Sequence, residues 1–325
     1  MKILKKVKVN FLLNKSYLFL SDSSYLILVT CCFLLYACQK EVKIDMPTYS
    51  PKLVVNCFFN PDSTWKVNLS SSVPISGNDQ PSYISNATVE LYEDNVLIST
   101  LSYADSNYVN NQKPLLNKLY TLKVSAPGFE SVECSDKLLS TTTTFTAKLD
   151  TIQRYITIKN LAFSENIPVS PLKIGIKDEA TVENFYEFRG IYTNDQITPV
   201  RTTNVIFHSL SPGLESFSRY QRLVLFRDLL FNGKENDLML YLDNQQTFFM
   251  TYLPSGDIGV LWWKINNLYF EMKQVSEQYF LYQKTFLQQK YNRENPFAEP
   301  TKVYTNVKNG LGIFAGYQSY KVKLL

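Results

Sequence analysis

The sequence contains a single histidine, His208. A serine or cysteine nucleophile that takes its base from histidine would have to use this residue, yet the chain has no Gly-x-Ser-x-Gly elbow. Zinc sites need cysteines and histidines in paired spacing, which is also missing. We therefore expect His208 to be an ordinary strand or loop residue. We expect no catalytic residue, no metal and no cofactor.

Carboxylates are harder to exclude, because a calcium site or a glycoside hydrolase can be built from acids alone. Asp178, Glu179 and Glu183 could converge, as could Asp228 and Asp237. Neither group has the spacing of an EF-hand, and solvated loop acids are the simpler interpretation of both.

The chain also lacks an excess of charge once its first residues are set aside. The formal net charge of +4 arises from the lysine-rich segment before Cys38. The remainder has 28 basic and 28 acidic residues. A body without net charge has no global attraction for phosphate backbones, so we expect no nucleic-acid partner.

Long apolar runs are missing too. Residues 25–35 form an uncharged apolar run of 11 residues, which is typical of a signal peptide and too short to span a bilayer. The sequence that follows, Leu35-Tyr36-Ala37-Cys38, resembles the lipobox of bacterial lipoproteins. The resemblance implies cleavage before Cys38 and a diacylglycerol on its thiol. We expect residues 1–37 to be a lipoprotein signal peptide and Cys38 to anchor the chain in a lipid bilayer.

Residues 38–50 are predicted to be a polar tether. They begin with Gln39-Lys40-Glu41 after the cysteine, which is similar to the charged signal by which Bacteroidota send lipoproteins to the outer face. We expect a lipid-anchored protein of the outer membrane, at the cell surface rather than facing the periplasm. The alternative is that these charges merely solvate the tether.

Aromatic residues are abundant, with 22 tyrosines and 21 phenylalanines, and suit half-buried pleated surfaces. Short segments of alternating polarity between turn residues predict strands at 53–59, 65–69, 88–92, 96–101 and 119–124. Regular short strands of this kind favour an immunoglobulin-like β-sandwich over residues 51–140. The fold class is therefore expected to be mainly β.

A polar Ser/Thr run at 140–144 is the candidate linker to a second domain, residues 145–325. Alternation around Phe188 and Phe270 predicts a larger antiparallel sheet there. Residues 276–292 instead place their apolar residues at helical spacing, with Ser276 as the N-cap. We expect one amphipathic helix there and a final strand at 320–324.

Trp262 and Trp263 are neighbours in a predicted strand, so their side chains point to opposite faces. A half-buried strand can place only one of them in the core. The other is then a candidate platform for binding a sugar or a partner protein. The equally good alternative is that both faces of the sheet are covered.

Cys57 and Cys134 are the thiols that remain besides the lipidated one. Alternation places both on core-facing sides of the first and last strands of the predicted sandwich, where a disulfide is conceivable outside the cytoplasm. Buried free thiols that pack as small apolar groups are the alternative. The sequence does not decide between the two.

Several segments, in order, resemble a family of Bacteroidota outer-membrane lipoproteins known as domain of unknown function 4249. They are PKLVV (51–55), NATVELY (86–92), KD (177–178) before NFY (184–186), DLLFNGK (228–234), NPF (295–297) and NVKNGLGIF (306–314). Cys57 departs from the pattern, where a smaller residue is usual. The resemblance implies association with TonB-dependent outer-membrane receptors and transfers no catalytic residue.

The leading hypothesis is a non-enzymatic accessory or ligand-binding partner of such a receptor. A surface hydrolase that uses carboxylates of the second domain is one alternative. An adhesin is the other.

Overall fold

The computed structural model describes residues 49–74, 80–138, 140, 143–150, 152–159, 164–177, 183–194, 201–209, 214–215, 222–230, 233–243, 248–252, 258–262, 267–293 and 297–324. Ser50–Leu325 form one compact unit, and the predicted signal peptide and Cys38 lie outside the described residues. Within the described ranges, no helix has the length and apolar character needed to cross a membrane.

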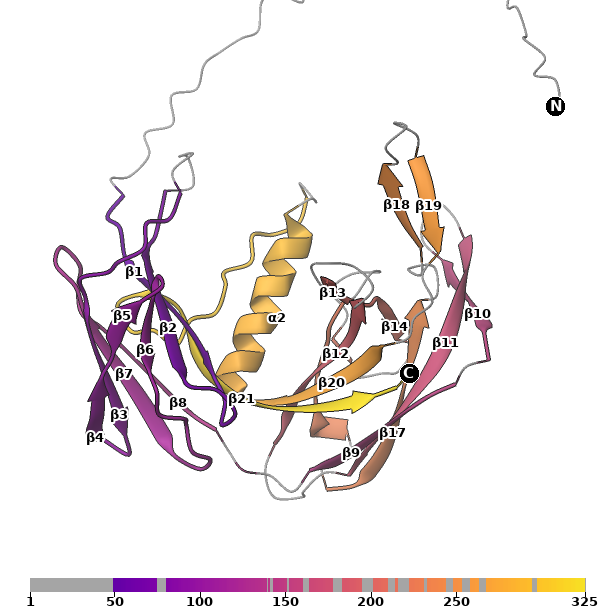
Figure 1. Ribbon diagram of the computed structural model, residues 1–325, viewed down its shortest axis with the longest axis horizontal. Helices are drawn as coiled ribbons and strands as arrows, with labels where there is room; N and C mark the ends of the chain where they lie inside the picture. Colours follow the sequence, from indigo (N-terminus) through magenta and orange to yellow (C-terminus); the bar gives the residue numbers. More distant parts are fainter. Residues whose placement is uncertain are drawn as a thin grey trace, which may run out of the picture. The chain divides into compact units, whose positions relative to one another are not determined.

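The fold is mainly β, as predicted, and its largest sheet has ten strands (Figure 1). These strands are β1 (Leu53–Phe59), β2 (Trp65–Ser71), β5 (Ser102–Ala104), β6 (Asn107–Asn110), β12 (Phe185–Asn194), β13 (Arg201–Asn204), β15 (Leu214–Glu215), β16 (Val224–Arg227), β20 (Leu268–Val275) and β21 (Leu311–Lys323). Their order is β15-β16-β12-β20-β21-β1-β2-β6-β5, with β13 paired to β12.

Two smaller sheets and a hairpin complete the described strands. The four-stranded sheet has the order β4-β3-β7-β8, built from β3 (Thr88–Glu93), β4 (Val96–Thr100), β7 (Leu119–Ser125) and β8 (Val132–Lys137). The five-stranded sheet contains β9 (Thr144–Leu149), β10 (Arg154–Lys159), β11 (Ser164–Lys177), β14 (Phe207–Ser209) and β17 (Glu235–Asp243). The hairpin joins β18 (Phe248–Tyr252) to β19 (Ile258–Trp262).

The first core lies between the four-stranded sheet and one end of the ten-stranded sheet. Along β1 every second side chain is buried, because successive residues of a strand point to opposite faces of the sheet. Trp65 lies at the centre of this core, with ring centroids 5.0 Å from Phe59 and 4.8 Å from Tyr120. The predicted strands at 53–59, 65–69, 88–92, 96–101 and 119–124 are all present, with small shifts at their ends.

A second core lies between β12 and β20 of the ten-stranded sheet and β11 and β17 of the five-stranded sheet. Phe188 and Phe270 are fully buried there, with ring centroids 5.1 Å apart. The predicted alternation in both strands is therefore confirmed. The predicted larger antiparallel sheet corresponds to two sheets packed against each other.

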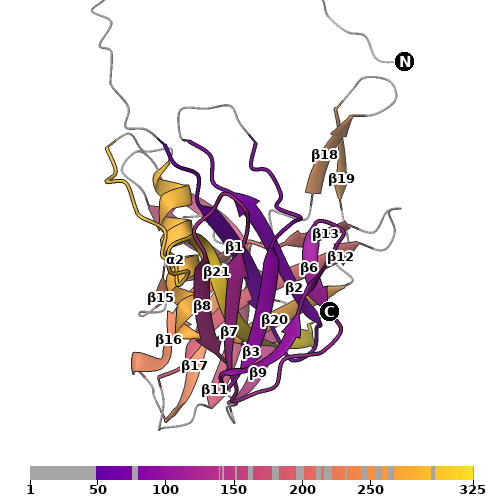
Figure 2. The ribbon, with the colours of Figure 1, turned by 90° about the vertical axis from the view of Figure 1, so that its left-hand side faces the viewer.

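The predicted helix is α2 (Glu277–Asn292), and the described residues contain one further helical turn, η1 (Asp228–Leu230). Ser276 is the N-cap, and its hydroxyl oxygen accepts a hydrogen bond from the backbone N–H of Tyr279 at 3.2 Å. Phe280 and Leu287 are buried against the opposite face of the ten-stranded sheet, in a third apolar cluster with Ile313. Figure 2 shows α2 beside β21 from a second side.

The last strand, β21, connects the two cores. Its first half pairs in parallel with β1, from Val54 opposite Leu311 to Phe59 opposite Gly316, and its second half pairs antiparallel with β20. Phe314 lies in the first core, although it follows the predicted linker by some 170 residues of sequence. The two predicted domains are therefore not independent, because the C-terminal strand completes the packing of the N-terminal one.

Candidate functional site

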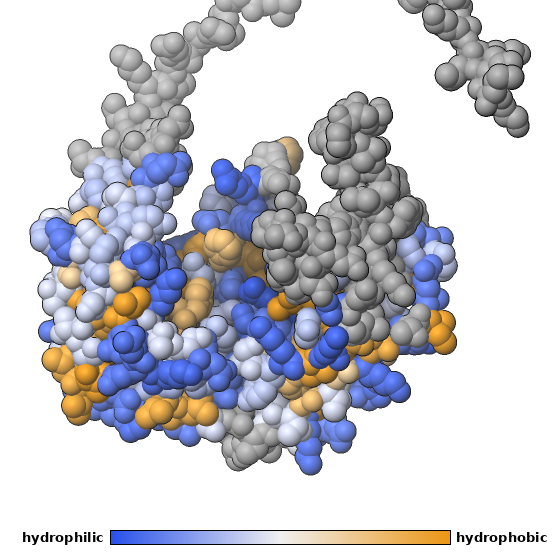
Figure 3. Space-filling model, viewed as in Figure 1, coloured by the Kyte–Doolittle hydropathy of each residue, from blue (hydrophilic) through white to orange (hydrophobic). Residues whose placement is uncertain are grey.

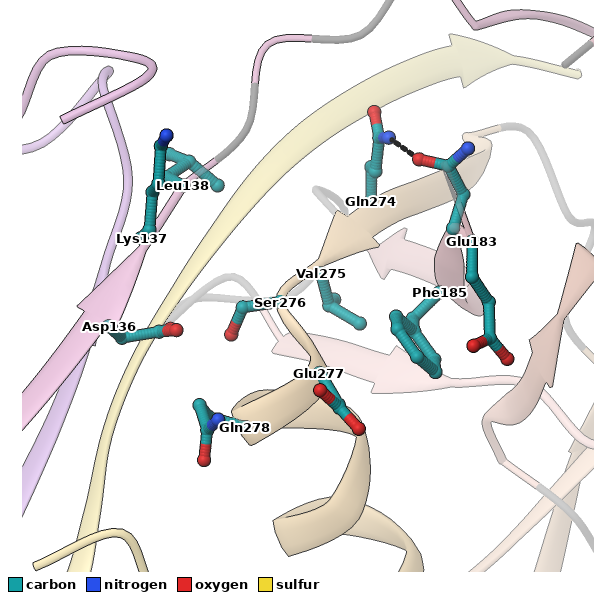
Figure 4. A pocket seen from close by; sticks show the side chains of 11 residues that line it. Asp136, Lys137, Leu138, Glu183, Phe185, Gln274, Val275, Ser276, Glu277 and Gln278 are labelled. Atoms are coloured by element: carbon teal, nitrogen blue, oxygen red, sulfur yellow. Dashed lines mark hydrogen bonds between the residues drawn. The ribbon is translucent and has the colours of Figure 1, made fainter. Parts of the chain in front are cut away.

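A cavity of about 330 Å³ lies where the ends of β8 and β20 meet the starts of β12 and α2 (Figure 4). The cavity lies at this point because α2 begins directly after β20, at Ser276, and the first residues of α2 lie near the end of β8. Three carboxylates line it: Asp136 of β8, Glu183 before β12, and Glu277 of α2. Figure 4 shows Asp136 pointing toward Ser276, whereas Glu183 lies on the far side of Phe185.

Asp136 is the most strongly perturbed acid of this cavity. Its Oδ2 accepts a hydrogen bond from the backbone N–H of Gly316 at 2.7 Å, and the Ser276 hydroxyl also bonds to the carboxylate. Burial raises the pKa of Asp136 to about 6, and the charge of Glu277 adds to the effect. Asp136 therefore links β8, β21 and the start of α2, and it changes its charge in mildly acidic solution.

The opposite wall of the cavity is a chain of amide and carboxylate groups. Gln274 donates from Nε2 to Asn184 Oδ1 at 2.8 Å. The backbone N–H of Asn184 donates in turn to Asp228 Oδ2 at 2.9 Å. Glu183 forms an ion pair with Arg227 at 3.5 Å at the exposed rim. The polar groups of this wall thus bond to one another.

A second cluster of polar side chains lies on the α2 side of the ten-stranded sheet, across three neighbouring strands. The register places Glu187 opposite Lys273 and Arg189 opposite Glu271. The next strand places Lys321 opposite Glu271. Opposite charges therefore face each other from β12 to β21, and we call these five residues the charged rows.

Glu187 is the centre of the charged rows and is fully buried. Its Oε1 lies 2.6 Å from Arg189 Nε and 3.3 Å from Lys273 Nζ, and its Oε2 accepts a hydrogen bond from the Tyr279 hydroxyl at 3.1 Å. Burial and then the Glu187 charge raise the pKa of Tyr279 well above its usual value. The acceptor atoms of Glu187 are therefore occupied by two cationic side chains and a phenol of the protein itself.

Cys57 and Cys134 are buried in the first core, as the alternation predicted, but they are free thiols. The candidate disulfide is not formed. Cys134 lies in the four-stranded sheet, so it faces β1 across the core and does not pair laterally with it. Burial, followed by the effect of Cys57, raises the pKa of Cys134. The free-thiol alternative is therefore the one present in the structure.

The candidate binding platform is only partly described. Trp262 is the last residue of β19 and lies opposite Phe248 in the hairpin, while Trp263 lies outside the described residues. His208, in β14, is buried and its Nε2 lies 3.1 Å from Asp243 Oδ2. This residue is a buried strand histidine with an acidic partner.

The candidate calcium ligands do not form one site in the described chain. Asp178 and Glu179 lie outside the described residues, whereas Asp237 forms an exposed ion pair with Lys173 at 2.7 Å. No group of three or more metal-binding side chains occurs among the residues that the structure describes.

Sequence reasoning missed both Asp136 and the charged rows. Alternation around Phe188 places Glu187 and Arg189 on the face opposite the second core, but it does not predict that this face is covered. Only the position of α2 over the sheet buries Glu187, and no local sequence signal records that packing. The aromatic side of the predicted helix was the one sequence signal that the helix packs against a sheet.

A protein-family model described as "Domain of unknown function (DUF4249)" matches residues 39–323. Neither the comparison with curated proteins nor the comparison with solved structures gives a match.

Proposed function

The chain belongs to the DUF4249 family, and from this premise we propose that it is a non-enzymatic lipoprotein of the outer membrane that assists a TonB-dependent receptor. The family description assigns no activity. The proposal combines the lipobox-like sequence at Cys38, the resemblance to Bacteroidota lipoproteins, and the chemistry of the cavity around Asp136 and of the charged rows. An immunoglobulin-like topology for the sandwich around Trp65 is part of the same proposal.

The observation that carries the non-enzymatic part is the pairing within the charged rows. Glu187 is buried between Arg189 and Lys273, so its charge is already neutralised by the protein's own cations. Catalytic acids and bases need a pKa near the working pH and access to a substrate. A fully buried carboxylate with two cationic partners has no access to a substrate, so we assign the function to the surface of the protein.

A co-purification experiment tests the receptor proposal. The chain carries a tag after Leu325, outer membranes are solubilised gently, and the bound proteins are identified by mass spectrometry. The proposal predicts recovery of a TonB-dependent receptor with the wild-type chain. The matched control is Cys38→Ala with the same tag, which should lose the receptor because the chain is no longer held at its membrane. Absence of any receptor from the wild-type sample, while other membrane complexes survive, contradicts the proposal.

A surface hydrolase is the second candidate, and Asp136 is the observation that favours it. Its pKa of about 6 suits a general acid, and it shares a cavity with Glu277 and Glu183. Hydrolysis of a panel of glycosides that disappears in Asp136→Asn, with the fold intact, would replace the accessory role. The hydrogen bonds to Asp136 from Gly316 and Ser276 favour the structural role instead.

A further inference from the structure

The C-terminal half of α2 and the segment 297–302 after it form an exposed surface with aromatic and basic side chains. Phe297 is 94% exposed and Phe286 is 41% exposed. An open groove of about 780 Å³ lies between Phe286 and the segment 298–301, which α2 holds through Asn292 and Gln289, both bonded to Thr301. Figure 3 shows hydrophilic and hydrophobic residues side by side at this end of α2. We call this surface, formed by residues 286–293 and 297–302, the α2 tip.

The α2 tip carries net positive charge. From position 286 to 302 the sequence has three cations, Lys290, Arg293 and Lys302, and two acids, Glu294 and Glu299, which is a net charge of +1. All three cations are exposed, and Lys290 and Arg293 line the same groove as Phe286. Aromatic rings together with lysine and arginine are the side chains that favour the headgroup region of anionic bilayers.

The tether reaches the folded body at the same end. In Figures 1 and 2 the first residues of β1 and the last turn of α2 lie at one end of the described body. At the other ends of the two elements, the ring centroid of Phe58, near the end of β1, lies 5.0 Å from that of Tyr279, near the start of α2. A chain from Cys38 to Leu53 spans at most about 50 Å when extended. A lipid on Cys38 therefore keeps the α2 tip within reach of the bilayer.

We propose that the α2 tip docks on the lipid bilayer that anchors the chain, with Phe297 in the headgroup region and Lys290 and Arg293 on anionic lipids. This inference rests on the proposed lipid anchor. The contact fixes the orientation of the body on the membrane, so that the opposite end, which carries the β3–β4 turn, points away from it. That orientation leaves the β3–β4 end free for other contacts.

Fluorescent probes on tethered protein test the orientation. Residues 39–325 carry an N-terminal hexahistidine in place of the lipid and bind vesicles of phosphatidylethanolamine and phosphatidylglycerol that contain a nickel-chelating lipid. A thiol-reactive, polarity-sensitive dye is placed by Phe297→Cys or, as the matched control, by Val96→Cys. Val96 is 65% exposed next to the β3–β4 turn, and the native thiols Cys57 and Cys134 are buried.

The proposal predicts that the dye at position 297 shifts its emission to the blue and is quenched by spin-labelled lipids, while the dye at position 96 is unaffected. The double variant Lys290→Glu with Arg293→Glu should reduce the quenching at position 297. Equal responses at both positions, or none at 297, would overturn the proposal. A response at 297 that requires receptor in the membrane would overturn it in favour of a protein partner.

The artificial tether separates this test from the proposed function. Failure of Cys38 to acquire lipid in cells would remove the natural anchor without changing the vesicle result. Conversely, a lipidated protein whose α2 tip stays in water would refute the docking alone.

Discussion

Around Trp65 the ten-stranded sheet packs through apolar side chains, whereas around Glu187, in the same sheet, charged groups are buried. Among the described residues, the first core contains aromatic and aliphatic side chains together with the thiols of Cys57 and Cys134. The second region buries the carboxylates of Glu187 and Glu271. The apolar end depends on volume and shape, and the polar end depends on the presence of every partner.

This difference has energetic consequences. An apolar core loses stability in proportion to the volume removed, because the transfer and cavity contributions both scale with size. A buried polar network loses more from the removal of one partner than from the replacement of the whole network. The strand β21 belongs to both regions, so disturbing it should affect both at once.

Gly312→Ala should have the largest effect. Gly312 has φ +96°, and an added Cβ would lie 2.0 Å from the carbonyl oxygen of Val55 in the paired strand β1. We expect a loss of about 5 kcal/mol or more in the free energy of unfolding, or failure to fold. Gly128→Ala is the control, because Gly128 also has positive φ but has nothing within 4 Å of its added Cβ. Equal effects of the two substitutions in urea titrations would show that β21 does not depend on this close approach.

Trp65→Ala should destabilise the apolar end by about 3–4 kcal/mol, because it opens a large cavity among Phe59, Tyr120 and Phe314. Trp65→Phe should cost much less, because Trp65 Nε1 is buried and has no hydrogen-bond partner among the described residues. Urea unfolding monitored by circular dichroism measures both. If Trp65→Phe is as unstable as Trp65→Ala, the stability of this core does not depend mainly on the volume of the side chain at position 65.

Glu187→Ala tests the polar end. It leaves Arg189 and Lys273 without their shared carboxylate, and we expect a loss of about 3 kcal/mol, since both cations are only partly exposed. Glu133→Ala is the matched control, because its ion pair with Lys123 is solvent-exposed and should contribute less than about 1 kcal/mol. Similar losses for the two variants in chemical denaturation would show that the charged rows contribute no more than a surface ion pair.

Asp136 makes stability depend on pH. Its pKa rises from 3.8 to about 6 on folding, so the native state binds the proton more tightly than the unfolded state does. The contribution of Asp136 is therefore fully present below pH 3.8 and is lost as the pH rises through about 6. The complete change corresponds to at most about 3 kcal/mol.

Asp136→Asn should remove this dependence, because asparagine keeps an acceptor for the Gly316 N–H but cannot titrate. Thermal unfolding between pH 4 and 7 should show a wild-type chain that loses stability relative to the variant as the pH increases. Asp105→Asn, at an exposed turn position, should follow the wild type. A constant difference between wild type and Asp136→Asn over this range would rule out the proposed titration.

The smallest effect is expected for the cysteines. Burial raises the pKa of Cys57 and of Cys134, so neither thiol should react with iodoacetamide at pH 8 in the native protein. Denaturation without a reducing agent should expose both to complete alkylation, as measured by mass spectrometry. An unalkylated pair in the denatured sample would reveal a disulfide.

Local patterns were sufficient to predict much of the fold. Alternation located β1, β2, β3, β4 and β7, and the helical spacing after Ser276 located α2 almost to the residue. Alternation also placed the side chains of Cys57 and Cys134 correctly in the first core. These features depend on the period of a strand or helix, which the sequence records directly.

The features that were missed depend on pairing between distant segments. The parallel pairing of β1 with β21 joins residues about 260 positions apart, and neither strand carries a signal for its partner. Glu187 is an ordinary outward-facing residue of β12 until α2 covers it. The raised pKa of Asp136 similarly requires β8, β21 and the start of α2 to meet. Such contacts are properties of the tertiary arrangement.

The most direct test of the lipid anchor is metabolic labelling with a palmitate analogue in cells that express the wild-type chain or Cys38→Ala. Lipid on Cys38 is the basis of both the accessory role and the docking of the α2 tip. The account predicts that the wild-type chain carries the label and sediments with outer membranes, while Cys38→Ala carries none and is not retained there. Equal labelling of the two chains, or retention of the unlabelled variant, would contradict it.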